Sequence, residues 1–182
     1  MDATAISIKC FASLEPDLRQ KAEDDIERIF FESSKTQSFE NAAVRQLFRD
    51  TWLSPYLDTF PDLMFVAYTD GAFIGYVTAC DRVPAGDASI DGQIYPSVFS
   101  DLWSSFPGHL HINVSANSRS HGVGARLIST AVEALKDRGT GGVHVVTGDG
   151  GRNMSFYRTH AFTHEIRRSC DGKKLLFMGR SL

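Results

Sequence analysis

The sequence predicts an α/β protein with one mixed sheet and helices on both faces. Segments in which apolar and polar residues alternate, as in strands, are followed by segments with apolar residues every three or four positions, as in helices. The clearest example is a strand–turn–helix–strand order between residues 110 and 146. The chain has 182 residues, of which 42% are hydrophobic, and this is enough for one well-filled core. We therefore expect residues 1–182 to form a single domain.

The first half of the chain predicts one strand, two helices and a hairpin. Residues 6–10 alternate as in a strand, and apolar positions at helical spacing follow from residue 18 to 30. A second helix is expected over residues 42–53. Its expected buried side consists of Val44, Leu47, Phe48 and Trp52. The favoured turn dipeptide Asp70-Gly71 then separates two apolar runs and predicts a β-hairpin.

The second half begins with an irregular stretch over residues 82–108. Glycine and proline break its periodicity but aromatic residues persist, so we expect an ordered excursion that contributes to the substrate site. The aromatic residues of this stretch are Tyr95, Phe99, Trp103 and Phe106. They would either line a slot for a substrate or form a small core of their own. The elements expected after it are a strand at 110–114, a helix at 120–138 that Gly139 ends, a strand at 143–146, a short helix at 153–159, and strands near 162–167 and 174–178.

Composition excludes several classes of protein. A formal net charge of −3 lacks the basic excess of a nucleic-acid-binding protein. Cys10, Cys80 and Cys170 stand far apart without a CxxC pair, so neither a metal site nor a disulfide framework is indicated. The N-terminus does not read as a signal peptide, and no run of about 18 apolar residues is present. We therefore expect a cytoplasmic protein with no nucleic-acid or membrane partner.

The stretch that says most about function is HLHINVSANSRSHGVGARL, residues 109–127. Gly122 and Gly124 stand at the expected start of a helix, where free amides and the helix dipole bind phosphate groups. Gly-x-Gly alone also fits an ordinary strand–helix junction. A dinucleotide fingerprint would need a small residue in place of Leu127, and a Walker loop would need lysine in place of Ala125. Both of these alternatives are excluded.

Two motifs resemble those of one superfamily. The pattern V-x-x-x-x-R-x-x-G-x-G, from Val114 to Gly124, resembles motif A of the GNAT superfamily of acyl-CoA-dependent acyltransferases. The segment NMSFYRTHAF, residues 153–162, resembles that family's N-x-x-F-Y-x-x-x-G-F motif, with Ala161 where glycine is frequent. The lead-in FPGHLHI is also similar to the acetyltransferase-like domains associated with O-GlcNAc hydrolases and their bacterial relatives. The resemblance implies a single GNAT-like domain whose central sheet is mixed, mostly antiparallel and splayed between two strands.

The resemblance also implies the cofactor, acetyl-CoA, and the residues that bind it. The pyrophosphate would lie on the backbone amides of the glycine turn, and the pantetheine arm would pair with the strand before it. A backbone amide near Val114 would polarise the thioester carbonyl. The cofactor-binding residues implied in this way are Ile112, Asn113, Val114, Arg119, Ser120, His121, Gly122, Val123, Gly124, Ala125, Asn153 and Tyr157.

The implied reaction is direct transfer of an acetyl group to an amine. Tyr157 corresponds to the family tyrosine that protonates the leaving thiolate. Residue 113 is asparagine, so an obvious carboxylate base on the central strand is missing. His111 is our favoured base, because histidine suits proton transfer and this one lies nearer the expected thioester; His109, Asp149 and water are alternatives.

The sequence leaves several acceptors and two oligomeric states to choose from. A small amine, an amino sugar or a peptide amine would each suit the implied chemistry, and the protein is expected to act as a monomer or homodimer. The missing carboxylate leaves a second hypothesis, a non-catalytic CoA-binding or protein-interaction module with the same fold.

Overall fold

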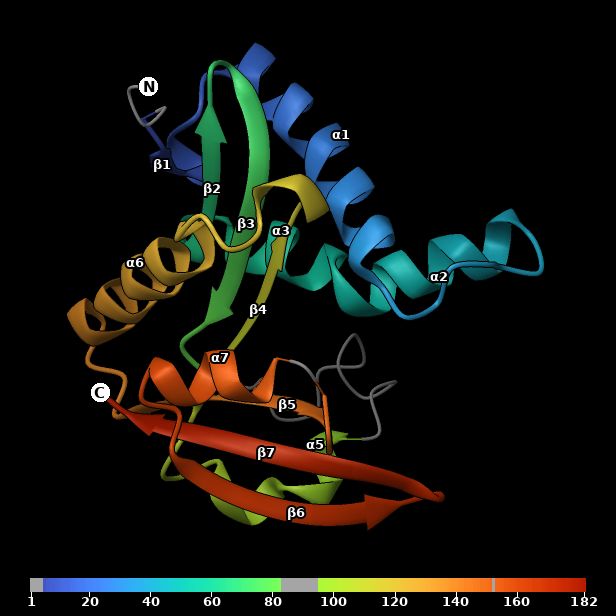
Figure 1. The fold of residues 1–182 in the computed structure, drawn as a ribbon, viewed down its shortest axis with the longest axis vertical. Coiled ribbons are helices and arrows are strands. Elements are labelled where there is room, and N and C mark those ends of the chain that lie inside the picture. Colours follow the sequence, from blue (N-terminus) through green and yellow to red (C-terminus); the bar gives the residue numbers. More distant parts are fainter. Residues whose placement is uncertain (1–4, 83–94, 152) are drawn as a thin grey trace. The chain divides into compact units, whose positions relative to one another are not determined.

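The computed structural model describes residues 5–82, 95–151 and 153–182. Its described elements form a seven-stranded sheet with the strand order β1-β2-β3-β4-β5-β7-β6. The ladder between β4 and β5 is parallel, whereas those of β1 with β2, β2 with β3, β5 with β7 and β6 with β7 are antiparallel. The expected α/β class with a mixed, mostly antiparallel sheet is therefore confirmed (Figure 1).

The chain divides into two compact units. Unit 1 comprises residues 1–79 and 111–131, and unit 2 comprises residues 80–110 and 132–182. The strands are β1 (Ser7–Cys10), β2 (Met64–Thr69), β3 (Ala72–Cys80), β4 (Gly108–Val114), β5 (Gly142–Gly148), β6 (His164–Cys170) and β7 (Lys173–Ser181). The α-helices are α1 (Pro16–Ser33), α2 (Ala42–Trp52), α3 (Ser54–Thr59), α5 (Tyr95–Val98), α6 (Val123–Asp137) and α7 (Met154–Thr159).

The core of unit 1 lies between α1 and the β2–β3 hairpin. Helix α1 begins at Pro16, whose fixed φ suits a first helical position, and it buries Ala22, Ile26 and Ile29 against the hairpin. The hairpin turn forms as expected, because Asp70 and Gly71 both adopt positive φ angles, 48° and 76°. In Figure 1, α1 and the first half of α6 lie on opposite sides of this hairpin.

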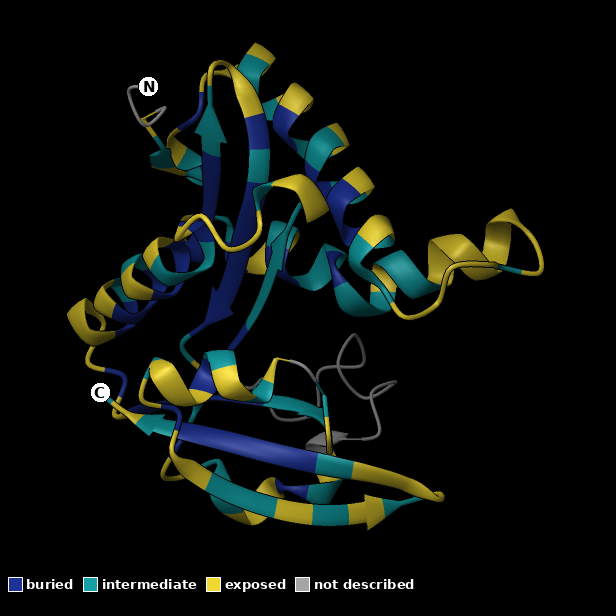
Figure 2. Cartoon of the chain, viewed as in Figure 1, coloured by how far each residue is buried: buried dark blue, intermediate teal, exposed yellow. Residues whose placement is uncertain are grey.

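Helix α2 departs from its expected packing. Val44 is 41% exposed and Leu47 is 66% exposed, and no residue of α2 is buried (Figure 2). Only the C-terminal part of the expected buried side makes contact, because the rings of Phe48 and Trp52 pack on the end of the core cluster. The predicted four-residue buried side is therefore wrong for Val44 and Leu47. The contacts of α2 with α1 are made by Arg45, Phe48 and Arg49 instead.

Unit 2 contains the described part of the irregular excursion. Phe99 and Phe106 are buried, and their ring centroids lie 5.4 and 5.7 Å from that of Phe177 on β7. These two aromatic residues therefore belong to the core of unit 2, which was one of the two expectations. Trp103 is half-buried, and residues 83–94 together with the side chain of Tyr95 lie outside the described part of the structure.

Two further observations concern the chain as described. All three cysteines are free thiols. None of the helices in the described ranges has the length and apolar character needed to cross a membrane.

Candidate functional site

Strand β4 carries the first group of predicted site residues, His111 to Val114, within unit 1. It lies beside β3, where the Ser115 amide donates a hydrogen bond of 2.9 Å to the carbonyl oxygen of Ile74. Gly75 permits this approach, because a Cβ at that position would lie 2.9 Å from the Asn113 carbonyl oxygen. The backbone of Asn113 and Val114 is thus fixed by β3.

The ladder between β4 and β5 is short. It consists of two residue pairs, Gly108 with Val143 and His109 with His144. Residues 110–114 of β4 have no ladder partner on β5 among the described residues. An extended ligand that carries amide groups can hydrogen-bond to the backbone of a strand where its ladder with the neighbouring strand ends.

The turn after β4 is not yet helical at the position predicted from sequence. Ser120 and Gly122 have φ angles of 64° and 78°, in the left-handed region, so α6 begins at Val123 rather than at Ser120. The Arg119 Nε donates a hydrogen bond of 3.0 Å back to the Val114 carbonyl oxygen. His121 is exposed. The expected start of the helix is corrected by three residues.

The first turn of α6 presents backbone donors. The Arg126 amide donates to the Gly122 carbonyl oxygen at 3.1 Å, so the amides of Val123, Gly124 and Ala125 precede the first intrahelical bond. A Cβ placed on Gly122 would meet no atom within 4 Å in the described structure, so the space above the turn is open. This arrangement fits the pyrophosphate of a nucleotide cofactor.

Asn153 and Tyr157 lie in unit 2. Asn153 directly precedes α7 but its side chain does not cap the helix; its Oδ1 instead accepts a hydrogen bond of 3.2 Å from the Thr147 hydroxyl on β5. Tyr157 is buried on α7, and burial raises the pKa of its phenol to about 12, although a hydrogen bond with Asn153 acts in the opposite direction. The phenol is therefore a neutral proton donor at physiological pH.

His111 lies at a pocket in unit 1. Its ring meets those of Trp52 and Tyr56 edge-on, with centroids 6.3 and 5.6 Å away. The pocket has a volume of about 160 Å³. Its lining is Phe30, Ser33, Ser34, Phe48, Trp52, Leu53, Tyr76, Thr78, His111 and Asn113. Neither motif contains Thr78 or Ser33, so sequence reasoning missed them. For Thr78 a sequence signal exists, because residues two apart in a strand lie on one face and Thr78 therefore shares a face of β3 with Tyr76.

The alternative bases differ from His111 in their surroundings. His109 is buried in unit 2, where its ring centroid lies 4.9 Å from that of His144. Burial lowers the pKa of His144 to about 4, and its Nδ1 lies 2.8 Å from the Phe106 carbonyl oxygen. Asp149 accepts a hydrogen bond of 3.3 Å from the Arg167 Nε. Of these predicted bases, His111 is the one that the structure places at a pocket.

A larger hollow of about 530 Å³ lies elsewhere on unit 1. It is lined by the end of α1, the start of α2 and the segment between them, with Glu32 and Arg45 at its rim. None of the residues predicted to be catalytic or to bind a cofactor lies there. Volume alone therefore does not identify the site, and the smaller pocket is the one that the predicted residues His111 and Asn113 line.

A strand whose ladder with its parallel neighbour is short, a helix start with free amides after it and a buried phenol on a short helix are features of acyl-CoA-dependent acyltransferases. The chain belongs to the acetyltransferase (GNAT) family, whose model matches residues 23–162. It is thus an acyltransferase that catalyses acetyl transfer, and its cofactor is acetyl-CoA.

Solved structures agree with this fold. The chain is similar to SsHAT, with 19% identity and a TM-score of 0.68 over 97% of this chain and 98% of that chain. It is similar to PH1933 from Pyrococcus horikoshii OT3, with 15% identity and a TM-score of 0.72 over 98% of this chain and 99% of that chain. It is also similar to the PaiA N-acetyltransferase from Thermoplasma acidophilum in complex with coenzyme A, with 11% identity and a TM-score of 0.61 over 98% and 99%. Among curated proteins, no sequence matches the chain.

Proposed function

We propose that the chain is an N-acetyltransferase that moves an acetyl group directly from acetyl-CoA to the nitrogen of a primary amine. In this proposal residues 1–182 act as one domain, as a monomer or homodimer, in the cytoplasm. The observation that carries the proposal is the geometry from Val114 to Ala125, where a fixed strand leads into a turn with open space and free amides. The relation to the O-GlcNAc hydrolase-associated domains stays a prediction.

The cofactor is held mainly by backbone groups in this proposal. Bound acetyl-CoA supplies an acetyl group activated as a thioester. The amides from Arg119 to Ala125 bind the pyrophosphate, and Ile112 to Val114 pair with the pantetheine amides. The Val114 amide donates a hydrogen bond to the thioester carbonyl oxygen. Asn153 provides a further side-chain contact to the pantetheine arm.

Two side chains handle the protons. Tyr157 gives the proton of its phenol to the departing sulfur, and its raised pKa keeps that proton in place until it is needed. His111 accepts the proton that the amine loses as its nitrogen bonds to the acetyl carbon. A neutral imidazole ring nitrogen has the lone pair that this step requires, and the ring lies at the pocket in which we place the acceptor.

The test combines binding and turnover. Calorimetric titration with acetyl-CoA should give a saturable 1:1 isotherm, and a panel of primary amines should release CoA thiol from acetyl-CoA. The variant His111→Gln should lower kcat about 100-fold and abolish the rise of the rate with pH that deprotonation of the base produces. The matched variant His164→Gln, at an exposed histidine of unit 2, should keep the wild-type profile.

Two results would contradict the proposal. A pH–rate profile unchanged in His111→Gln would remove that histidine as the base. Acetyl-CoA binding without thiol release for any amine would favour a non-catalytic CoA-binding module.

A further inference from the structure

Strand β3 holds Asn113 at both its backbone and its side chain. Its backbone lies against Gly75, where a Cβ would come within 2.9 Å of the Asn113 carbonyl oxygen. Its side-chain Nδ2 donates a hydrogen bond of 2.8 Å to the hydroxyl oxygen of Tyr76. Because Gly75 and Tyr76 are consecutive residues of one strand, the position of Asn113 and the direction of its amide group are set together.

The partner in that hydrogen bond belongs to the core. Tyr76 is buried within the core cluster of unit 1 and pairs with Val66 in the ladder between β2 and β3. Burial raises the pKa of its phenol, so the group stays neutral and its oxygen accepts the hydrogen bond from Asn113. The packing of unit 1 therefore orients the Asn113 amide.

This orientation leaves the amide oxygen of Asn113 for another group. Asn113 lines the pocket beside His111. No described residue donates a hydrogen bond to its Oδ1, and this oxygen is not one of the described side-chain atoms that are buried without a partner. The oxygen is therefore accessible, unlike the hydroxyl oxygens of Thr78 and Ser33 in the same lining. A hydrogen-bond donor in the pocket can reach it.

The spacing of His111 and Asn113 suits a single nitrogen atom. Residues two apart in a strand project from the same face, about 7 Å from each other. Two hydrogen bonds of about 3 Å each, made by one nitrogen, span most of this distance. A primary amine between the two side chains can therefore direct one N–H to each of them.

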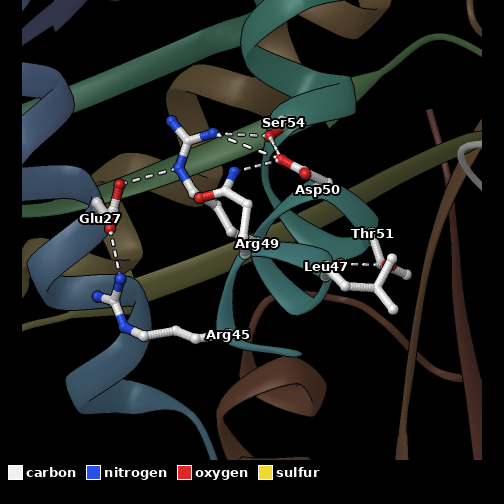
Figure 3. Close-up of polar contacts among 8 residues, drawn as sticks. Glu27, Arg45, Leu47, Arg49, Asp50, Thr51 and Ser54 are labelled. Atoms are coloured by element: carbon white, nitrogen blue, oxygen red, sulfur yellow. Dashed lines mark hydrogen bonds and ion pairs between the residues drawn. The ribbon is translucent and has the colours of Figure 1, made fainter. Parts of the chain in front are cut away.

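The aromatic wall of the pocket is attached to the same unit. Phe48 and Trp52 line the pocket from α2. The carboxylate of Glu27 on α1 accepts hydrogen bonds from two arginines of α2, Arg45 Nη1 at 3.1 Å and Arg49 Nε at 2.9 Å (Figure 3). These ion pairs tie α2 to α1, so the rings on which an acceptor packs belong to the unit that also contains Asn113.

We propose that Asn113 Oδ1 accepts a hydrogen bond from the N–H that the acceptor amine keeps, and that Tyr76 is the positioning residue for this contact. The inference rests on the proposed amine acetylation and gives the reason why its acceptor is a primary amine. The amine nitrogen bonds to the acetyl carbon as the carbon–sulfur bond breaks, His111 takes one amine proton, and the departing sulfur takes the phenol proton of Tyr157. The second N–H stays on the product amide and remains hydrogen-bonded to Asn113.

An amide in place of a carboxylate suits this task. An amide oxygen accepts a hydrogen bond but takes up no proton near neutral pH, so Asn113 orients the nitrogen and leaves proton transfer to His111. The hydrogen bond strengthens as positive charge develops on the attacking nitrogen. A secondary amine has a single N–H, which it gives to His111, so it cannot keep the contact with Asn113.

Matched amines test the contact. The probes are phenethylamine, whose ring suits the aromatic lining, and N-methylphenethylamine; any other amine of the panel that releases thiol is paired with its N-methyl derivative. Asn113→Leu has a similar volume but no acceptor. It should lower kcat/KM for the primary amine roughly 10- to 100-fold, as expected for one lost hydrogen bond to a charged group, and remove the preference over the N-methyl amine. The Kd of acetyl-CoA should stay that of the parent, because the backbone amides remain.

Asn113→Asp is the conservative variant. It keeps an oxygen acceptor towards the pocket, while its second carboxylate oxygen accepts a hydrogen bond from the Tyr76 hydroxyl. The preference for the primary amine should therefore persist in this variant. A preference lost as fully as in Asn113→Leu would show that the amide nitrogen, rather than the oxygen, meets the substrate, and would overturn the inference.

Tyr76→Phe tests the positioning role. It removes only the phenol oxygen and should lower the preference for the primary amine about fivefold, with no further effect on this preference in the Asn113→Leu background. A merely structural role would lower turnover of the primary and the N-methyl amine alike, in both backgrounds. Tyr68→Phe, on the neighbouring strand β2 and outside the pocket lining, is the control and should keep the parent's preference.

Nuclear magnetic resonance supplies a readout that does not depend on acetyl transfer. The side-chain amide signal of Asn113 is the one that disappears in Asn113→Leu. Phenethylamine should shift this signal in a saturable way, because Oδ1 belongs to the same amide group. The trimethylammonium analogue of phenethylamine, which has no N–H, should leave it in place.

The outcomes separate this inference from the proposed function. Acetylation of amines with the same preference in the parent and Asn113→Leu would overturn the inference and leave the proposed function intact. A shifted Asn113 signal without thiol release for any amine would support the contact and overturn acetyl transfer to amines. Neither a shifted signal nor thiol release would overturn both.

Discussion

Tyr157 shows how burial sets the protonation state of a single residue. An ordinary tyrosine loses its proton near pH 10, whereas burial raises the pKa of Tyr157 to about 12. The raised pKa means that the folded protein retains the acid across the whole neutral and moderately alkaline range. The wild-type rate should therefore show no loss from ionisation of Tyr157 up to about pH 10.

Removal of the phenol oxygen should affect turnover rather than cofactor binding. Tyr157→Phe keeps the ring contact with Phe162, at 5.6 Å between centroids, but has no proton to give to the sulfur. We expect kcat to fall about 100-fold or more, with the Kd of acetyl-CoA within about twofold of the parent. Thiol-release kinetics and calorimetry measure the two quantities. Tyr68→Phe, on β2 in the other unit, serves as the control, and equal loss in both variants would remove the proposed acid role.

Among single residues, the sequence could point to those that belong to a motif but not to those that line a pocket only once the chain has folded. Asn153 and Tyr157 were identified because the motif fixes their spacing. Thr78, which lines the pocket beside His111, was not, because no motif contains it. Its place at the pocket depends on residues of α1 and α2, which are distant in sequence.

At the scale of elements, the open space at the turn into α6 is where an added side chain should compete with the cofactor. Gly122→Trp should abolish acetyl-CoA binding, because the added side chain fills the open space beside the free amides. In the parent, acetyl-CoA at one hundred times its Kd should stabilise the fold by about 2.7 kcal/mol, which raises Tm by roughly 5–10 °C. The variant should show no such shift in a thermal melt.

The control for this prediction lies at the other end of the same helix. Gly139 has a φ angle of 73° and, like Gly122, open space where a Cβ would stand in the described structure. Gly139→Trp therefore carries the same backbone strain but should retain both binding and the thermal shift. If acetyl-CoA failed to raise Tm in both variants, backbone strain would explain the loss, and the result would contradict a cofactor site at Gly122.

The predicted elements are confirmed in order and type, and their errors have local causes. The hairpin at Asp70-Gly71 and the end of α6 at Gly139 follow from residue types that favour positive φ. The start of α6 was placed too early because Ser120 adopts positive φ without being glycine. The buried side of α2 was overestimated because a helical period shows an apolar stripe but not which part of it meets another element.

At the scale of the whole molecule, His144 links stability to pH. Burial lowers its pKa to about 4 from an ordinary value near 6.5, so the unfolded chain binds a proton more readily than the folded one. The stabilisation is thus complete above pH 6.5 and is lost as the pH falls towards 4. This single group should lower the free energy of unfolding by up to about 3 kcal/mol over that interval.

Urea unfolding at pH 7, 5.5 and 4.5 measures this dependence. His144→Phe retains the stacking on Phe177, whose ring centroid lies 4.8 Å away, but cannot take up a proton. The variant should lose less stability between pH 7 and 4.5 than the parent, whereas His164→Phe, at an exposed histidine, should lose as much as the parent. Equal pH dependence in the parent and His144→Phe would contradict the assignment.

The family and the α/β class could be predicted from 182 residues because they depend on the order of elements and on two contiguous motifs. The division into two compact units could not, since it depends on which residues contact each other in space. Both β4 and α6 cross this division, at residues 110–111 and 131–132, and neither boundary leaves a mark in the sequence pattern.

Strand β4 assigns different tasks to its backbone and its side chains, and this has a consequence for how such a protein evolves. In the proposed function its backbone, fixed beside Gly75, binds the cofactor. The side chains of His111 and Asn113 line the pocket in which we place the acceptor. Substitutions that alter these side chains leave the amides in place, so a lineage can change its substrate while its cofactor site remains under constant selection.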